Sequence, residues 1–259
     1  MKRMFLGVGM VAAMLLAASS AMAGGLNLAW SNCLGDGGLP NRVNACTSNA
    51  GSAFLSASFV VDADITGATG IAPTVDFIAG DGTSALPPWW QMLGAGQCRG
   101  TPAALSANVS LPATAVNCVD WAQGGATGAI AGGIQTATPP SGWSIAPANE
   151  PAHGRIVLAS AVPSNAPVDL TTGTEYFAFN LSISNRASVG TGSCAGCSTG
   201  GCWVLNSIKI SQGITDLPPL TTGVSAGSNI ATYQSTTPNC QLVPTRTTTW
   251  STVKRMYHN

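Results

Sequence analysis

Charged residues are scarce in this sequence, since Lys, Arg, Asp and Glu make up 8% of its 259 residues. Ten basic residues balance ten acidic ones, so the formal net charge at neutral pH is zero. A nucleic-acid-binding protein needs a basic patch that neutralises phosphates. So few positive charges do not form one, and the composition excludes a nucleic acid as the partner.

Histidine and glutamate are rare as well, which limits acid–base chemistry. His153 is the only histidine away from the C-terminus, in a Pro-rich stretch between Glu150 and Arg155, and we expect a surface histidine there rather than a general base. Glu150 and Glu175 are the only glutamates, and no acidic residue lies in a recognisable glycosidase motif. We therefore expect a protein that is not an enzyme. The alternative is a secreted hydrolase whose polar residues converge only in the folded chain.

Only one run of the sequence is long and apolar, and it lies at the N-terminus. Two basic residues precede an apolar stretch from Met4 to about Ala18, and Ala-Met-Ala follows at 21–23. This order is typical of a secretory signal peptide. We predict that residues 1–23 are removed and that no later segment spans a membrane. The remaining chain has eight basic and ten acidic residues, a formal net charge of −2.

Cysteine, by contrast, is plentiful for a chain of this kind. An even number of cysteines in an exported chain predicts disulfides, here four, formed by Cys33, Cys46, Cys98, Cys118, Cys194, Cys197, Cys202 and Cys240. Spacing favours Cys33 with Cys46 and Cys98 with Cys118. The last four cysteines would then pair among themselves, in an order that the sequence leaves open. Each such loop would stabilise the fold by about 3 kcal/mol.

The pair Cys194 and Cys197 has the C-x-x-C spacing of metal, haem and redox sites. Residue 198 is Ser rather than His, which excludes the c-type haem signature. No further ligand pair follows at a zinc spacing, and the βαβ context of a thioredoxin-like site is absent from the pattern. Structural disulfides are the better interpretation.

Short segments of alternating apolar and polar residues predict β-strands. The clearest is the run in which Phe177, Phe179, Leu181 and Ile183 share one face. Glycine- and proline-rich turns separate the segments, and 118–133 fits either a short helix or an irregular loop. The predicted strands cover 25–30, 54–61, 74–79, 105–111, 155–162, 177–184, 202–210 and 229–234. Such spacing is typical of an all-β protein, an antiparallel β-sandwich formed by residues 24–244 with long disulfide-pinned loops.

The C-terminal residues 245–259 have a different pattern. Trp250, Val253 and Tyr257 follow one another at i, i+3 and i+7, which places them on one helical face. We predict a short C-terminal helix that packs on the sandwich. A surface-sorting signal is the functional alternative for this segment.

Tryptophans in the predicted loops are the strongest sign of a binding function. An exposed indole ring stacks on sugar rings or anchors a protein partner, and the loop tryptophans are Trp89, Trp90, Trp121 and Trp143. We expect that they fill the core beneath the loops. The alternative is that they form a platform for an extracellular glycan or protein.

Two further motifs suggest chemistry. Asp62 and Asp64 begin a stretch that resembles a calcium loop, but Pro73 stands where an EF-hand has its bidentate glutamate. We expect solvated turn residues at this pair, and the alternative is a looser calcium site, the only cofactor site that the sequence suggests. Residues 223–227 match G-x-S-x-G, yet no acidic residue follows Ser225, so we expect a loop there rather than a nucleophile.

Several stretches carry a resemblance to known proteins. GTEYFAFNLSISN at 173–185, CAGCSTGGCWVLNSI at 194–208, the opening GLNLAW and the ending TWSTVKRMY resemble an uncharacterised group of exported bacterial β-sandwich proteins. The hairpin pattern is also similar, more distantly, to cohesins and carbohydrate-binding modules. The resemblance implies a jelly-roll-type sandwich, secreted to the periplasm or the exterior, that binds proteins or sugars and in some members calcium. The ligand and the oligomeric state stay open.

Overall fold

The computed structural model describes residues 24–80, 85–92, 96–101, 103–130, 153–234 and 240. The predicted signal peptide at 1–23, Trp143 and the predicted helix at 245–259 lie outside these residues. Within them the chain is mostly β-structure, with two short 3-10 helices, η1 (Leu34–Asp36) and η2 (Pro88–Trp90). None of the helices in this part of the chain is long and apolar enough to cross a membrane.

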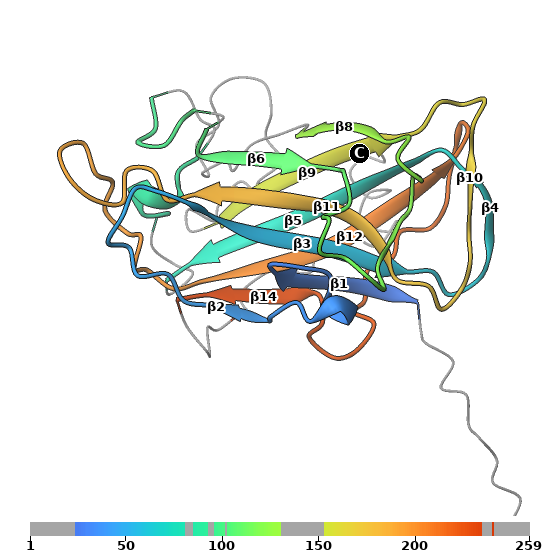
Figure 1. Ribbon diagram of the computed structural model, residues 1–259, viewed down its shortest axis with the longest axis horizontal. Coiled ribbons are helices and arrows are strands. Elements are labelled where there is room, and N and C mark those ends of the chain that lie inside the picture. Colours follow the sequence, from blue (N-terminus) through green and yellow to red (C-terminus); the bar gives the residue numbers. More distant parts are fainter. Residues whose placement is uncertain are drawn as a thin grey trace, which may run out of the picture.

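The first sheet has five strands in the described residues (Figure 1). Its main path is β1 (Gly25–Trp30), β3 (Ser52–Val60), β11 (Tyr176–Ser184) and β6 (Leu105–Asn108), all antiparallel. The short β7 (Val119–Asp120) pairs in parallel with the start of β11. Below, we call this the five-stranded sheet.

The second sheet has seven strands and runs behind the first in Figure 1. Its order is β2 (Asn41–Arg42), β14 (Ile230–Tyr233), β12 (Gly201–Gln212), β5 (Gly70–Ala79), β9 (His153–Ala161) and β8 (Thr127–Ile130), with β13 (Thr215–Asp216) on β12. The pairs are antiparallel except for β2 with β14. A separate two-stranded ribbon is formed by β4 (Ile65–Ala68) and β10 (Val168–Leu170).

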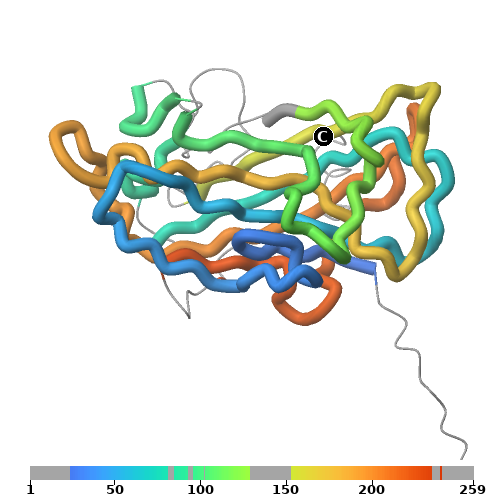
Figure 2. The backbone as a smooth tube through the Cα atoms, viewed as in Figure 1, coloured from blue at the N-terminus to red at the C-terminus, as the bar shows by residue number. Residues whose placement is uncertain are grey.

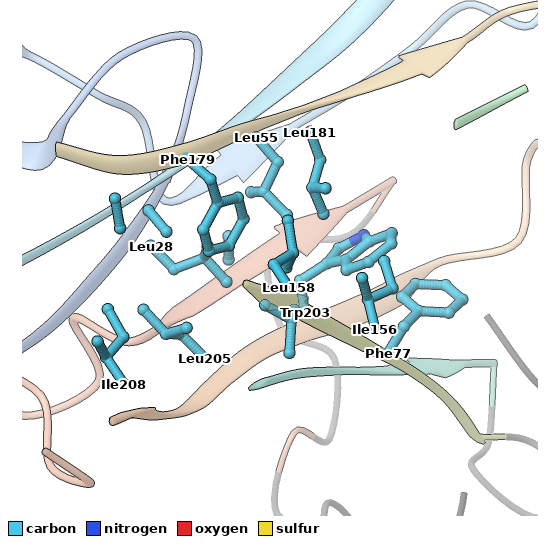
Figure 3. Close-up of a cluster of buried hydrophobic side chains, with 14 of the residues drawn as sticks. Leu28, Leu55, Phe77, Ile156, Leu158, Phe179, Leu181, Trp203, Leu205 and Ile208 are labelled. Atoms are coloured by element: carbon cyan, nitrogen blue, oxygen red, sulfur yellow. The ribbon is translucent and has the colours of Figure 1, made fainter. Parts of the chain in front are cut away.

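Side chains of the two sheets meet in one hydrophobic cluster. Figure 3 shows Leu55 and Phe179 of the five-stranded sheet facing Trp203 and Leu158 of the seven-stranded sheet. Each of these residues is 0–1% exposed. Burying one side chain of this size contributes about 1.5–3 kcal/mol, so this cluster is the main source of stability.

Each predicted strand overlaps an observed one, although β6 ends at Asn108 and not at residue 111, and the mostly β fold is confirmed. The predicted facing of Phe177 is wrong, because Phe177 does not share the face of Phe179. The register of β11 against β3 shifts between these residues, and this β-bulge moves Phe177 into a separate cluster with Cys33 and Cys118. The ambiguous region 118–133 contains β7 and β8, not a helix.

Residues 109–118, which we call the strap, connect β6 to β7 across the five-stranded sheet. Figure 2 shows this green segment passing in front of β11 and β3 toward η1. Leu111 and Ala115 of the strap pack on the cluster that contains Phe177. The strap is therefore the cover for the residue that the bulge turned outward.

Candidate functional site

The cysteines form four disulfides, and all eight lie in the described residues, none of them free. The bonds are Cys33–Cys118, Cys46–Cys197, Cys98–Cys194 and Cys202–Cys240. The predicted pairs Cys33–Cys46 and Cys98–Cys118 are wrong, because sheet order, and not spacing in the sequence, decides which loops meet. The first three bonds span 85, 151 and 96 residues. Four such bonds indicate an oxidising location, extracellular or periplasmic.

The two cysteines of the C-x-x-C motif do not form a disulfide with each other. Cys194 bonds to Cys98 and Cys197 bonds to Cys46, so the two sulfurs hold two different loops against the glycine-rich loop after β11. A dithiol redox site needs the two cysteines to pair with each other. The structure therefore gives this motif a cross-linking role.

The alternative of a tryptophan platform is not formed by the described tryptophans. Trp89 and Trp90 of η2 are 0% exposed and Trp121 is 1% exposed, which is the expected place in the core. The Trp90 ring centroid lies 4.2 Å from that of Phe77 and 4.9 Å from that of Tyr233. These rings are packed against one another and offer no face to a sugar.

A buried cation lies beside these rings. Arg99 is 3% exposed, and its guanidinium donates to the backbone carbonyls of Trp89 at 2.8 Å, Ala104 at 3.4 Å and Ser184. Burial lowers the pKa of Arg99 to about 10, so the side chain stays charged at neutral pH. Backbone carbonyls, and no carboxylate in the described residues, compensate its charge.

The proposed calcium ligands lie at the exposed turn between β3 and β4. The Asp64 carboxylate accepts a 2.8 Å hydrogen bond from the backbone N–H of Thr172, which is a turn-stabilising contact. Among the described residues, one group of three potential metal ligands lies within ligand distance, and it consists of Cys33, Asp36 and Cys118. Its sulfurs form a disulfide and are not available to an ion. Calcium at Asp62 and Asp64 therefore stays a prediction.

Asp76 is the centre of a charged cluster on three neighbouring strands. It lies on β5, opposite Arg155 of β9, which donates to its carboxylate at 2.5 and 2.6 Å. Asn206, at a β-bulge in β12, donates to the same carboxylate at 2.5 Å. Asp76 itself is 4% exposed. Sequence reasoning missed this cluster, although a lone Asp within the apolar strand 74–79 was a signal for it.

His153 is the first residue of β9 and faces Ile78 of β5 across the ladder. It is 5% exposed, so the expected surface histidine is wrong. The strand pairing draws it into the sheet, because β9 begins two residues earlier than the pattern suggested.

Two further carboxylates hold the strap and η1 in place. Glu175 accepts from the Asn27 amide at 3.0 Å, from the Ser58 hydroxyl and from the Gly35 N–H at 2.9 Å. Asp36 accepts from the backbone N–H groups of Asn117 at 2.7 Å and Cys118 at 3.0 Å. These acids thus stabilise the structure.

The balance of two effects sets the pKa of Asp36. Burial raises it, but hydrogen bonds from the backbone of Asn117 and Cys118 outweigh burial, and the pKa of this carboxyl is lowered. The charged form is therefore the one that the folded strap favours.

A hollow of about 320 Å³ lies where the strap leaves β6 and where the chain continues beyond β7. Its lining combines apolar and polar side chains, from Val109, Ser110, Leu111, Asp120, Gln123 and Ala126, with the backbone of Gly124. The Asp120 carboxylate accepts from the N–H groups of Ala122 at 2.9 Å and Gly124 at 2.6 Å, which fixes the turn. Gln123 has a left-handed φ of 52° and an exposed side chain. The described residues thus offer a ligand a hollow of mixed polarity at this place.

The G-x-S-x-G segment is a loop between β13 and β14, as expected. Ser228, just after it, donates to the carbonyl of Leu26 at 2.8 Å and accepts from the N–H of Ser225 at 3.2 Å. These bonds tie the loop to the edge strand β1. The arrangement has no strand-to-helix turn that would raise Ser225 as a nucleophile.

The fold and its cross-links define a class, a mostly β protein with four disulfides. No family model, curated protein or solved structure matches the chain. Its function is therefore argued from the residues described above.

Proposed function

We propose that this chain is an exported protein with a non-enzymatic binding or structural role at the cell exterior. The observation that carries the proposal is the set of long-range disulfides, above all Cys46–Cys197, which spans 151 residues. Disulfides persist in oxidising compartments outside the cytosol. The signal-peptide pattern at 1–23 supports the same location.

We propose further that the two sheets form an antiparallel β-sandwich of the jelly-roll or cohesin-like kind, with the tail 245–259 as an appended helix. The shared cluster of Figure 3 supports this arrangement, since side chains of both sheets contribute to it. Such a module stabilises itself through its core and cross-links and presents its loops to a partner.

The state of the polar residues supports a role other than catalysis. Asp76, Glu175 and Asp36 each accept two or more hydrogen bonds from neighbouring groups of the protein. A catalytic carboxylate must instead present an oxygen to a substrate proton or a reacting carbon. Among the described carboxylates, these three therefore act as structural acceptors.

The binding surface that fits best is the hollow beside the strap. Glycan sites combine an apolar platform with a few polar groups that fix the hydroxyls, and Leu111 and Gln123 supply one of each. A volume of about 320 Å³ lies at the lower end of the range for small-molecule sites. The partner that it suits is one ring of an extracellular glycan, with a protein loop as the second candidate.

A glycan array probed with the mature chain tests the binding role. Gln123→Gly removes the side chain and suits the left-handed φ of 52°, so we expect normal folding and at least tenfold weaker binding, about 1.4 kcal/mol. Phe54→Ala, at an exposed residue of the five-stranded sheet, is the matched control and should bind normally. Trp89→Ala is unsuitable, because truncating a buried indole costs about 3–5 kcal/mol of stability.

Fractionation of cells expressing the full chain tests the location separately. We expect the 24–259 product outside the cytosol, with eight oxidised cysteines by mass spectrometry. A cytosolic product with free thiols overturns export, whereas glycan binding that survives Gln123→Gly overturns only the assignment of the hollow.

A further inference from the structure

The outward side of the seven-stranded sheet is the face that points away from the main hydrophobic cluster. The burial of its side chains changes along the strands. At one end, Ile78, Val204 and Asp76 point away from the main core, yet they are only 3–4% exposed. Further along the same side, Lys209 and Asp216 have side chains that are 45% and 50% exposed. A sheet face that is open to water would not bury aliphatic side chains at one end alone, so a cover lies over this end.

Three aliphatic side chains of the described residues meet at this end. Ile78 and Val204 form a small cluster of their own, separate from the main core, with the half-buried Ile230 of β14 beside it. Beside it, Asp76 faces Val204 across the ladder and pairs with Arg155, and the Asp76 side chain is 5% exposed. A buried carboxylate is paired in this way where water is kept from it, so this end of the sheet face is covered.

A disulfide brings one end of the chain to this patch. Cys202 faces Ile78 across the β12–β5 ladder and lies two residues before Val204, on the same side of β12. Its partner is Cys240, with the Cα atoms 5.6 Å apart. The chain after residue 240 therefore starts from the edge of the patch, whatever path it then follows.

We propose that the C-terminal segment 241–259 is the occupant of this patch. Trp250, Val253 and Tyr257 supply an apolar face at helical spacing, which matches the aliphatic seat. The disulfide makes the contact intramolecular, so even a weak interface is occupied at the high effective concentration of a short tether. The tail that the sequence predicts to pack on the sheets thus has a specific seat on the outward side of β5 and β12.

Hydroxyl-radical footprinting read by mass spectrometry tests the seat, because it reports side-chain exposure. The chain 24–259 is compared with a chain that ends at residue 240 and keeps its disulfide. We expect oxidation of Ile78, Val204 and Ile230 to rise several-fold in the shorter chain. Phe54, exposed on the other sheet, should react equally in both.

A pair of full-length variants decides the question without shortening the chain. Trp250→Ala/Tyr257→Ala should raise the oxidation of Val204, and Thr252→Ala, on the opposite face of the predicted helix, should not. Near-UV circular dichroism confirms that each protein is folded. Unchanged oxidation of Val204 in the folded short chain and in the double variant overturns the proposal. The proposal is also overturned if the oxidation of Val204 rises only after deletion of 133–150, which would assign the cover to that segment. A rise only on dilution would assign the cover to a second copy and overturns the proposal as well. The glycan-binding result is independent of every one of these outcomes.

Discussion

The guanidinium carbon of Arg99 lies 3.7 Å from the centroid of the Trp89 ring, and both residues are buried. The same arginine donates to the carbonyl of Trp89 at 2.8 Å. One side chain thus holds the backbone and the ring of the same tryptophan, and it joins η2 to the ends of β6 and β11 through Ala104 and Ser184. The buried guanidinium of Arg99 therefore holds these segments together.

Replacing Arg99 should therefore destabilise the fold strongly. Arg99→Met keeps the apolar stem but removes the guanidinium donor from the carbonyls of Trp89 and Ser184, and Ala104 keeps only the N–H of Ser184. We expect a loss of about 3 kcal/mol in the free energy of unfolding. Urea denaturation measures it. Arg186→Ala, at an exposed arginine, is the control and should change stability by less than about 0.5 kcal/mol. A Met variant as stable as the parent would contradict the role given to Arg99.

The disulfides should differ in their contribution according to the loop that each closes. On the chain-entropy model, removing Cys46–Cys197 by a double Ser substitution costs about 5 kcal/mol, and removing Cys202–Cys240 costs about 4 kcal/mol. Their separations of 151 and 38 residues are the reason. Denaturation midpoints check the order, and non-reducing peptide mapping checks the pairing. A mapped Cys33–Cys46 bond in the native protein would refute the pairing described here.

The pair Asp76–Arg155, in which the carboxylate is buried and the guanidinium is partly exposed, should couple far more strongly than the exposed pair Lys209–Asp216. The Asp76 and Arg155 side chains are 5% and 23% exposed, against 50% for Asp216. A double-mutant cycle with Asp76→Asn and Arg155→Met should give a coupling energy of about 2 kcal/mol, since charged hydrogen bonds in a buried site are strong. The equivalent cycle at Lys209 and Asp216 should give less than about 0.5 kcal/mol. Equal couplings would show that burial does not strengthen the Asp76 pair.

Acid should weaken the attachment of the strap. The folded-state pKa of Asp36 lies below its ordinary value of 3.8. The stability that its ionised carboxylate contributes is therefore fully present above that ordinary value, and it is lost as the pH falls through the folded pKa. We expect Asp36→Asn to be less stable than the parent protein at pH 7. On acidification from pH 5 to pH 2 its free energy of unfolding should fall by less than that of the parent. Urea midpoints across this range measure both effects, with Asp62→Asn as the control at an exposed aspartate. Parallel curves for Asp36→Asn and the parent would contradict the assignment.

Alternation of side chains was enough to predict most of the sheet structure. The runs that became β3 and β11 have one apolar face over most of their length, and a strand buries that face whatever its partners are. The same pattern says nothing about a register shift. Phe177 was therefore placed on the wrong face, because a bulge changes facing without changing composition.

The site residues were harder to predict for a related reason. A tryptophan after Pro-Pro has the local signature of a loop, yet η2 turns Trp89 and Trp90 inward between the sheets. Whether a loop folds over the core depends on segments that are distant in the sequence. Here the Ser188 hydroxyl accepts a 3.0 Å hydrogen bond from the indole N–H of Trp89. The cysteine pairing failed in the same way. Cys46 and Cys197 share one end of the molecule only because β2, β14 and β12 are neighbours.

For a chain that is exported from its N-terminus, as proposed above, the cross-link pattern determines the order in which the cysteines can pair. Cys33 emerges first, and both Cys46 and Cys98 follow before its true partner, Cys118, arrives. An oxidase that acts on each thiol in order of emergence would join neighbours and trap the wrong isomer. Productive assembly therefore requires either delayed oxidation or thiol–disulfide exchange by an isomerase. In a host that has only an oxidase, the yield of native protein should be limited by this reshuffling step.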